Sequence, residues 1–344
     1  MSRSLSHDEV SRKVQSVGGS SFTVSLPKEW ATDHGLEAGT EVYMYPHEDG
    51  TLILRTSGRD DDAGGVDLTV DDLASEKLPS VVTALYVAGE DRFTLQTDER
   101  FTSAERRAIT TAGNELIGLE VADEATDRVT FRSMRRSGQL SIGQTVLNLR
   151  YVALSMHRNA MSALLDVDAD AAREALAHTD DVDRQFALVS RCVERRIGLP
   201  RGPNRPDVDR RTALDYYAIG RELEGIAACA ERVATVALEL DDPPAGSARS
   251  ELDDYARRSR TVVERAVEAT INGRVPATAY EALDEYEALT ADLDLLDGPS
   301  SDVDDVNPYY LALVLDALVG TANHGGKIAE RALKMGLRAE SPPR

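Results

Sequence analysis

The chain has 344 residues and a formal net charge of −21, because 60 acidic residues outnumber 39 basic ones. This length allows two or three domains, and ordinary apolar content predicts packed cores. The two cysteines, Cys192 and Cys229, exclude a disulfide framework and fit a reducing cytoplasm. The first ten residues lack the apolar run of a signal peptide, and the most apolar run, 309–319, is too short to span a bilayer. We therefore expect a cytoplasmic protein without membrane insertion.

The charge pattern is typical of proteins from extreme halophiles. Lysine occurs at only five positions, whereas aspartate is abundant. High net charge keeps such proteins soluble, and molar salt screens the self-repulsion. An acidic protein from a moderate environment is the alternative, but the scarcity of lysine favours the halophile. The overall charge then reflects the solvent, so partners must be inferred from local charge.

Residues 10–54 read as four short strands and one short helix. Phe22, Val24 and Leu26 alternate with polar residues, which predicts a strand, and Pro27 suits the first helical position. Gly35 is expected to end the helix, and Asp49-Gly50 predicts a hairpin turn. A unit of this size has little core of its own, so dimerisation is expected.

The next segments form a linker and a small α/β unit. Residues 56–66 are polar and rich in Gly and Asp, as in a linker. A helix is expected around 73–87, a strand over 92–97, a helix from Ser103 to about Ile117, and strands over 119–124 and 128–133. Thr102 or Ser103 followed by Glu105 suits a helix N-terminus.

From about residue 141 the apolar spacing predicts long antiparallel helices in two groups of three, separated by "DDPPAGSARS" at 241–250. Each helix of the first group has a stripe of regularly spaced apolar residues, and the three stripes begin at Leu147, Val182 and Leu223. The second comprises helices at about 251–272, 277–296 and 308–337. Aligning 223–238 with 318–333, an offset of 95, gives six identities in 16 positions. Equal layouts on both sides favour an internal duplication.

The sequence contains no enzyme signature. "VGGSS" is not followed by a helix, so it is no phosphate-binding loop, and neither zinc nor hydrolase spacing is present. The strongest local feature is the N-terminal segment, where four cations face three carboxylates within residues 1–30. Arg12, Lys13 and Lys28 flank strands rich in hydroxyls, which suit phosphate contacts. The alternative is three solvated charges.

The segment "RKVQSVGGSSFTVSLPKEWATDHGLEAGTEVYMYPHEDGTLIL" resembles the AbrB/MazE/SpoVT family of swapped-hairpin domains. "SLPKEW", "HGLEAGTEV" and "DGTLIL" carry the resemblance in order. It implies an interlocked homodimer that binds double-stranded promoter DNA through Arg12, Lys13, Ser20, Ser21 and Lys28. The low basic content departs from the family pattern, so a head that only dimerises remains an alternative.

The segment "RPDVDRRTALDYYAIGRELEGIAACAERVATVALEL" resembles the signature helix of PhoU, the phosphate-uptake regulator. That family has two three-helix bundles, and it implies signalling between phosphate status and transport or transcription through partner proteins. Its E-x-x-x-D pair binds metal clusters, since carboxylates four residues apart share a helix face.

The acidic pair of the PhoU motif is degenerate in this chain. Glu224 keeps the first position and Ala228 replaces the second, while the repeat has Val319 and Asn323 beside His324. We therefore expect no full metal cluster and no cofactor. One weak divalent-metal site remains an option, formed by Glu224, Glu231 and Asp183.

Six arginines against two aspartates gather in residues 195–211. This segment is either an edge that binds anions or a partner, through Arg201, Arg205, Arg210 and Arg211, or a set of arginines at helix ends.

The sequence thus predicts a multidomain α+β protein and no enzyme. Its expected parts are a swapped-hairpin DNA-binding domain (10–55), an α/β connector (67–136) and PhoU-like three-helix bundles (141–240 and 251–338). The expected function is a DNA-binding regulator of phosphate uptake. The alternatives are a phosphate-signalling adaptor whose head never touches DNA, and an antitoxin-like partner protein, which the long helical part disfavours.

Overall fold

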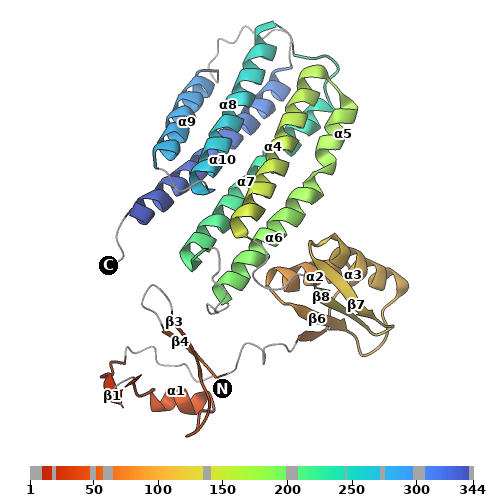
Figure 1. Ribbon diagram of the computed structural model, residues 1–344. Helices are drawn as coiled ribbons and strands as arrows, with labels where there is room; N and C mark the ends of the chain where they lie inside the picture. The colour runs from red at the N-terminus through yellow and green to blue at the C-terminus, as the bar shows by residue number, and fades with distance from the viewer. Residues whose placement is uncertain are drawn as a thin grey trace. The chain divides into compact units, whose positions relative to one another are not determined.

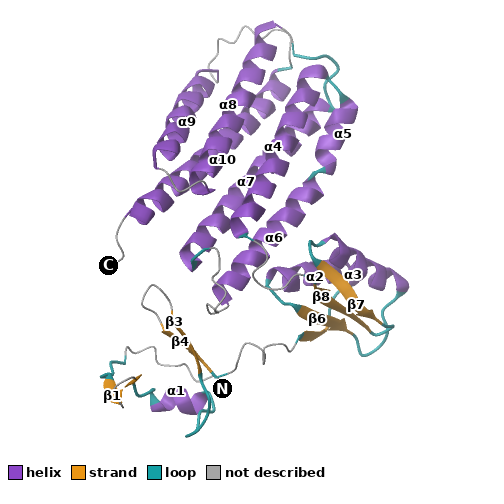
Figure 2. Ribbon diagram, in the orientation of Figure 1, coloured by secondary structure: helices purple, strands orange, loops and turns teal. Residues whose placement is uncertain are grey.

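The computed structural model describes residues 10–17, 21–46, 52–56, 65–134, 141–198, 208–244, 246–271, 276–296 and 307–340. It is a multidomain α+β protein, and its described strands precede residue 134, after which the described elements are helices (Figure 2). The chain forms two compact units, Met1–Ala63 and Gly64–Arg344 (Figure 1). We call the first unit the head. None of the described helices is long and apolar enough to cross a membrane.

The head contains two antiparallel strand pairs and one short helix. Strand β1 (Gln15–Val17) pairs with β2 (Ser21–Thr23), and β3 (Tyr43–Pro46) pairs with β4 (Leu52–Arg55), with α1 (Lys28–Asp33) between the pairs. This order is the predicted one. The strand predicted to reach Leu26 ends at Thr23, because β1 offers only three partner residues, and Pro27 precedes the helix as its N-cap.

Two glycines with left-handed backbone turn the chain after α1. Gly35 has φ of 67° and Gly39 has φ of 97°, a region that side chains with a Cβ rarely adopt. The Leu36 amide donates to the Ala31 carbonyl at 2.8 Å, which closes the helix end. The predicted stop at Gly35 is therefore confirmed. The predicted turn at Asp49-Gly50 lies outside the described residues.

The connector, residues 65–134, is a four-stranded sheet with two helices. Its elements are β5 (Val66–Thr69), a 3₁₀ turn (Ser75–Lys77), α2 (Leu78–Val87), β6 (Arg92–Gln96), α3 (Ser103–Glu115), β7 (Leu119–Glu124) and β8 (Arg128–Ser133). The sheet order is β5-β6-β8-β7, with β5 parallel to β6 and the other pairs antiparallel. Strand β5 is not among the predicted elements, because it lies next to a Gly- and Asp-rich stretch.

Side chains at every second strand position form the core of the connector, and a capping box fixes the start of α3. Phe93, Leu95 and Phe131 alternate onto one face of the sheet and are completely buried. Thr102 and Glu105 form a capping box at the start of α3, where each side chain accepts from the other residue's backbone N–H. The expected helix start at this position is confirmed.

The helical region consists of α4 (Ile142–Asp166), α5 (Ala169–Ala177), α6 (Thr179–Gly198), α7 (Arg210–Ala237), α8 (Gly246–Ile271), α9 (Pro276–Leu296) and α10 (Pro308–Glu340). The prediction of three helices before residue 241 omitted α5. Val167 turns the chain with φ of 50°, and Asp168 caps α5 by accepting from Asp170 and Ala171. A short amphipathic helix between two long ones carried no separate signal in the sequence.

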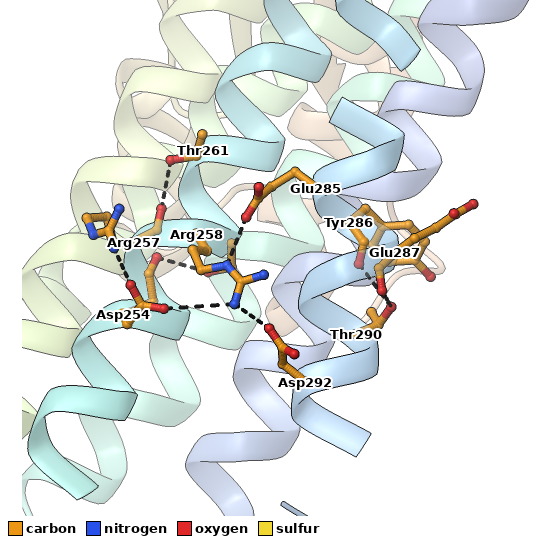
Figure 3. Close-up of polar contacts among 11 residues, drawn as sticks. Asp254, Arg257, Arg258, Thr261, Glu285, Tyr286, Glu287, Thr290 and Asp292 are labelled. Atoms are coloured by element: carbon orange, nitrogen blue, oxygen red, sulfur yellow. Dashed lines mark hydrogen bonds and ion pairs between the residues drawn. The ribbon is translucent and has the colours of Figure 1, made fainter. Parts of the chain in front are cut away.

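One hydrophobic core runs through both groups of helices. Its buried members include Leu149 of α4, Leu223 of α7, Val263 of α8 and Leu318 of α10. Polar contacts also join α8 to α9. Arg258 of α8 donates to Glu285 of α9 at 2.8 Å and to Asp292 of α9 at 2.7 Å (Figure 3). The two predicted groups therefore share a core and do not form separate globules.

Two arginines of α6 hold the connector. Arg191 donates to the carbonyls of Tyr86 at 2.6 Å and Glu90 at 2.9 Å, and its guanidinium lies 4.7 Å from the Tyr86 ring centre. Arg195 donates to the Gly89 carbonyl and pairs with Asp91. These bonds satisfy carbonyls at the C-terminal end of α2, where cations are favoured. The arginines at the end of α6 therefore serve as an anchor for the connector.

Replacing Arg191 with alanine should loosen this anchor. The change removes the hydrogen bonds of Arg191 to two carbonyls, of which that of Tyr86 keeps the Gly89 N–H as a donor. Losing a buried charged hydrogen bond costs about 1.5–3 kcal/mol. Hydrogen exchange at the amides of α2 and the start of β6 should become faster, with that of α7 unchanged. Arg173→Ala, which removes an exposed guanidinium on α5, is the control and should alter neither region. Unchanged exchange in α2 would show that Arg191 does not hold the connector.

Candidate functional site

The head presents the predicted DNA-contacting residues at its surface. Arg12 and Lys13 precede β1, Ser21 begins β2 and Lys28 begins α1, and all four are exposed. The three cations have no carboxylate within ion-pair distance in the described part of the chain; Arg12 donates only to the neighbouring Ser11 carbonyl at 2.9 Å. Ser20 lies outside the described residues. The cations are thus available to an anionic partner.

The same unit exposes an unusual amount of apolar surface. Phe22 is 78% exposed, Val14 is 64% exposed and Met44 is 60% exposed. Among the head residues whose side chains are described, some are partly buried and none is fully buried. A unit that completely buries none of these apolar side chains within one chain has too little core to fold stably alone. Stable folding therefore requires that these apolar side chains be buried by residues other than the described residues of the same head.

The residues of the weak metal site are only partly brought together. Burial is the main cause that raises the pKa of Glu224 on α7. The Arg221 ion pair at 2.5 Å opposes this effect, and the charge of nearby Asp183 on α6 adds to it. Burial and Asp180 raise the pKa of Asp183. Glu231 is exposed about two turns further along α7 than Glu224. Within the described ranges, no group of three or more His, Cys, Asp or Glu residues is arranged to hold a metal ion.

The repeat-related positions meet where α7 packs against α10. A Cβ on Gly225 would lie 2.3 Å from the His324 ring, and one on Gly320 would lie 2.8 Å from the Cys229 sulfur. The offset of 95 relates Gly225 to Gly320, and Cys229 to His324. His324 of α10 therefore packs on Gly225 of α7, and Cys229 of α7 packs on Gly320 of α10, so the two contacts are related by the repeat. This exchange is the arrangement that two copies of one duplicated helix would make.

A polar cluster surrounds this crossing. His324 Nδ1 lies 2.7 Å from Glu222 Oε2, and Arg232 donates to Cys229 at 3.4 Å. A hydrogen bond with Cys229, then one with Glu222, raises the pKa of His324 against the effect of burial. Burial alone would raise the pKa of Cys229, but hydrogen bonds with His324 and Arg232 outweigh it and lower that pKa. Glu222 and Cys229 were not predicted as neighbours of His324, since only helix packing brings the three side chains together.

The predicted arginine edge is described only in part. Arg201 and Arg205 lie outside the described residues. Arg210 and Arg211 form the first turn of α7, where Arg211 is exposed and Arg210 is half-buried. Neighbouring Arg196 donates to the Val208 carbonyl at 2.6 Å, so it supports the local chain path.

Comparison with known protein families gives one match in the head and one in the helical region. The family model "Antidote-toxin recognition MazE, bacterial antitoxin" matches residues 15–62, and the PhoU domain model matches residues 146–237. A search of curated proteins found no match to this chain.

Two solved structures are similar to this chain. PhoU from Pseudomonas aeruginosa has 18% identity and a TM-score of 0.47, covering 58% of this chain and 96% of that one. The phosphate transport system regulatory protein PhoU from Streptococcus pneumoniae has 17% identity and a TM-score of 0.45, covering 56% and 92%. The two family-model matches by themselves show that the chain carries a MazE/AbrB-type domain at its N-terminal end and a PhoU domain in its helical region.

Proposed function

We propose that this protein is a DNA-binding transcriptional regulator of phosphate uptake that acts as a homodimer. The observation that carries the proposal is the presence of a MazE-type segment and a PhoU domain in one chain. A PhoU domain indicates regulation of phosphate uptake, and a MazE-type head indicates either DNA binding or an antitoxin-type role. Joining the two makes a regulator that reads DNA the simplest function.

The surface of the head supports both parts of this proposal. Its exposed apolar residues call for a second copy, because a partner head carries the same residues and can bury them reciprocally. Pairing two heads also doubles the available cations, so Arg12 and Lys13 of each chain can contact phosphates together. Hydroxyl groups such as that of Ser21 add hydrogen bonds that salt screens less than long-range attraction.

A signalling adaptor is the second candidate. Its supporting observation is the small number of cations on the head within a chain of net charge −21. In molar salt, counterion release contributes little free energy to DNA binding, so a few cations need help from base-edge or shape readout. An adaptor would keep the dimeric head and pass the phosphate signal to a protein partner through the helical region.

The double variant Arg12→Glu/Lys13→Glu separates these candidates. If the head reads DNA, the variant should abolish binding to promoter fragments from phosphate-transport genes, because four cations of the dimer become carboxylates facing phosphates. Binding is measured by fluorescence anisotropy at the salt concentration at which the chain is folded, against coding-region DNA of equal length. Sedimentation checks that the variant is still a dimer.

The matched control is Lys77→Glu/Lys334→Glu, which changes the net charge equally at two exposed lysines outside the head. It should bind promoter DNA like the unaltered protein. If the unaltered dimer fails to bind any promoter fragment, or if the head variant binds as well as the control, the DNA-binding proposal is wrong. A dimer without DNA binding would favour the adaptor.

A further inference from the structure

A groove runs between α4 and α8, and none of the residues of the polar cluster on α7 and α10 lines it. Its volume is about 530 Å³. The two helices are antiparallel here: Arg249 near the start of α8 contacts Leu165 and Asp166 near the end of α4, whereas Arg260 contacts His157 further back. The residues that matter for its chemistry are Arg158, Met161, Asp166, Arg249, Asp253 and Arg260.

Two of the three arginines in the groove lack a carboxylate partner. Arg249 is neutralised by Asp166, with 2.7 Å between Nη2 and Oδ1. Arg158 and Arg260 form no ion pair with any described residue; Arg260 donates only to His157, over 3.3 Å. The two guanidiniums are close enough for Arg158 to lower the pKa of Arg260, adding to the larger effect of burial, while the more weakly acting charges of Asp253 and Glu264 raise it. In a chain with a large excess of carboxylates, two neighbouring unpaired arginines at a cavity indicate a site for an external anion.

The other end of the groove is also suited to negative charge. Helix α8 begins at Gly246, which lines the groove together with Arg249 and Ser250. The first N–H groups of a long helix have no partner within it and carry partial positive charge. Between the two ends, Met161 and Leu165 supply apolar surface, and the exposed carboxylate of Asp253 can accept hydrogen bonds from hydroxyl groups.

We propose that the α4–α8 groove binds a phosphate group, with Arg158 and Arg260 as its ligands. Its size lies within the range of small-molecule sites, roughly 300–1,000 Å³, and exceeds what a lone phosphate ion fills. The preferred ligand is therefore a phosphorylated small molecule, whose hydroxyls meet Asp253 and whose remaining body lies along Met161. This site goes beyond the proposed function, since it places ligand binding on the PhoU-containing helical region itself.

The test uses the full chain without DNA, so its result does not depend on what the head binds. Isothermal titration with inorganic phosphate, ribose 5-phosphate, AMP and ATP is run in parallel at the salt concentration at which the chain is folded. We expect saturable binding of at least one phosphorylated probe. Arg158→Gln should weaken it by about tenfold or more, because the charged hydrogen bonds to the phosphate are lost. Arg158 is exposed, so this substitution should leave the fold intact.

Two further variants sharpen the test. Arg260→Gln should weaken the same probe similarly, whereas Arg265→Gln, an exposed arginine on α8 outside the groove, should not. Tighter binding of esters than of phosphate identifies an organic ligand, and equal binding identifies the free ion; both support the site. The proposal is overturned if no probe binds, or if Arg158→Gln and Arg260→Gln bind as tightly as Arg265→Gln.

Discussion

Acidification from pH 7.5 to pH 5.5 should lower the free energy of unfolding by roughly 1–2 kcal/mol through His157 alone. His157 lies in α4 and is completely buried. Its pKa falls from 6.5 to about 3, mainly through burial and also through the charges of Arg260 and Arg158. Arg260 can only donate, so His157 Nδ1 accepts and the neutral ring carries its proton on Nε2.

The sign follows from which state takes up the proton. Above pH 6.5 the imidazole is neutral in both states, and the contribution to stability is fully present. As the pH falls below 6.5, His157 becomes protonated in the unfolded chain, whereas in the folded chain it stays neutral until the pH approaches its pKa of about 3. Stability is therefore lost progressively across this window, by roughly 4–5 kcal/mol in total.

The variant His157→Gln should remove this pH dependence. The neutral glutamine amide can still accept a hydrogen bond from Arg260. Because glutamine does not titrate, any loss of stability that it causes is the same at every pH and does not change how the free energy of unfolding varies with pH. Urea unfolding is measured between pH 7.5 and 5.5, where most carboxylates remain ionised, and the slopes of the two proteins are compared. His34→Gln, a change on the exposed surface of the head, should keep the slope. Equal slopes for His157→Gln and the unaltered protein would contradict the assignment.

Replacing Gly113 with alanine should destabilise the connector by about 1–3 kcal/mol. In most helices this change stabilises by up to about 1 kcal/mol, because alanine has the higher helix propensity. Here a Cβ would lie 2.1 Å from Phe131 Cε1, far inside van der Waals contact. Phe131 is completely buried on β8 and packs against Phe93, so its ring cannot move aside without disturbing the core.

Hydrogen exchange at β6 and β8 measures this effect within the full chain. The control is Gly143→Ala on α4, where the nearest atom to the new Cβ is the Tyr216 hydroxyl at 3.4 Å. That change should be neutral or slightly stabilising. Adding Phe131→Leu to Gly113→Ala should cost less than the sum of the single changes, since the smaller side chain makes room. Additive losses would show that the clash is not the cause.

Local patterns in the sequence were sufficient for most individual elements. Thr102 and Glu105 marked the start of α3, Gly35 marked the end of α1, and alternation around Phe22 marked β2, because caps and periodicity are properties of neighbouring residues. The two missed elements were short: β5 lies beside a Gly- and Asp-rich stretch, and α5 between two long helices. Their apolar residues are too few to establish a period.

The sequence by itself therefore determined the multidomain α+β plan, the helix-rich second half and the two family resemblances. Only the tertiary structure decided which distant side chains meet. It placed Cys229 beside His324, anchored the connector on Arg191, and left Arg158 and Arg260 at a groove without an ion-pair partner among the described residues. The physical reason is that such contacts depend on how the helices pack, and residues one hundred positions apart carry no mutual signal in one sequence.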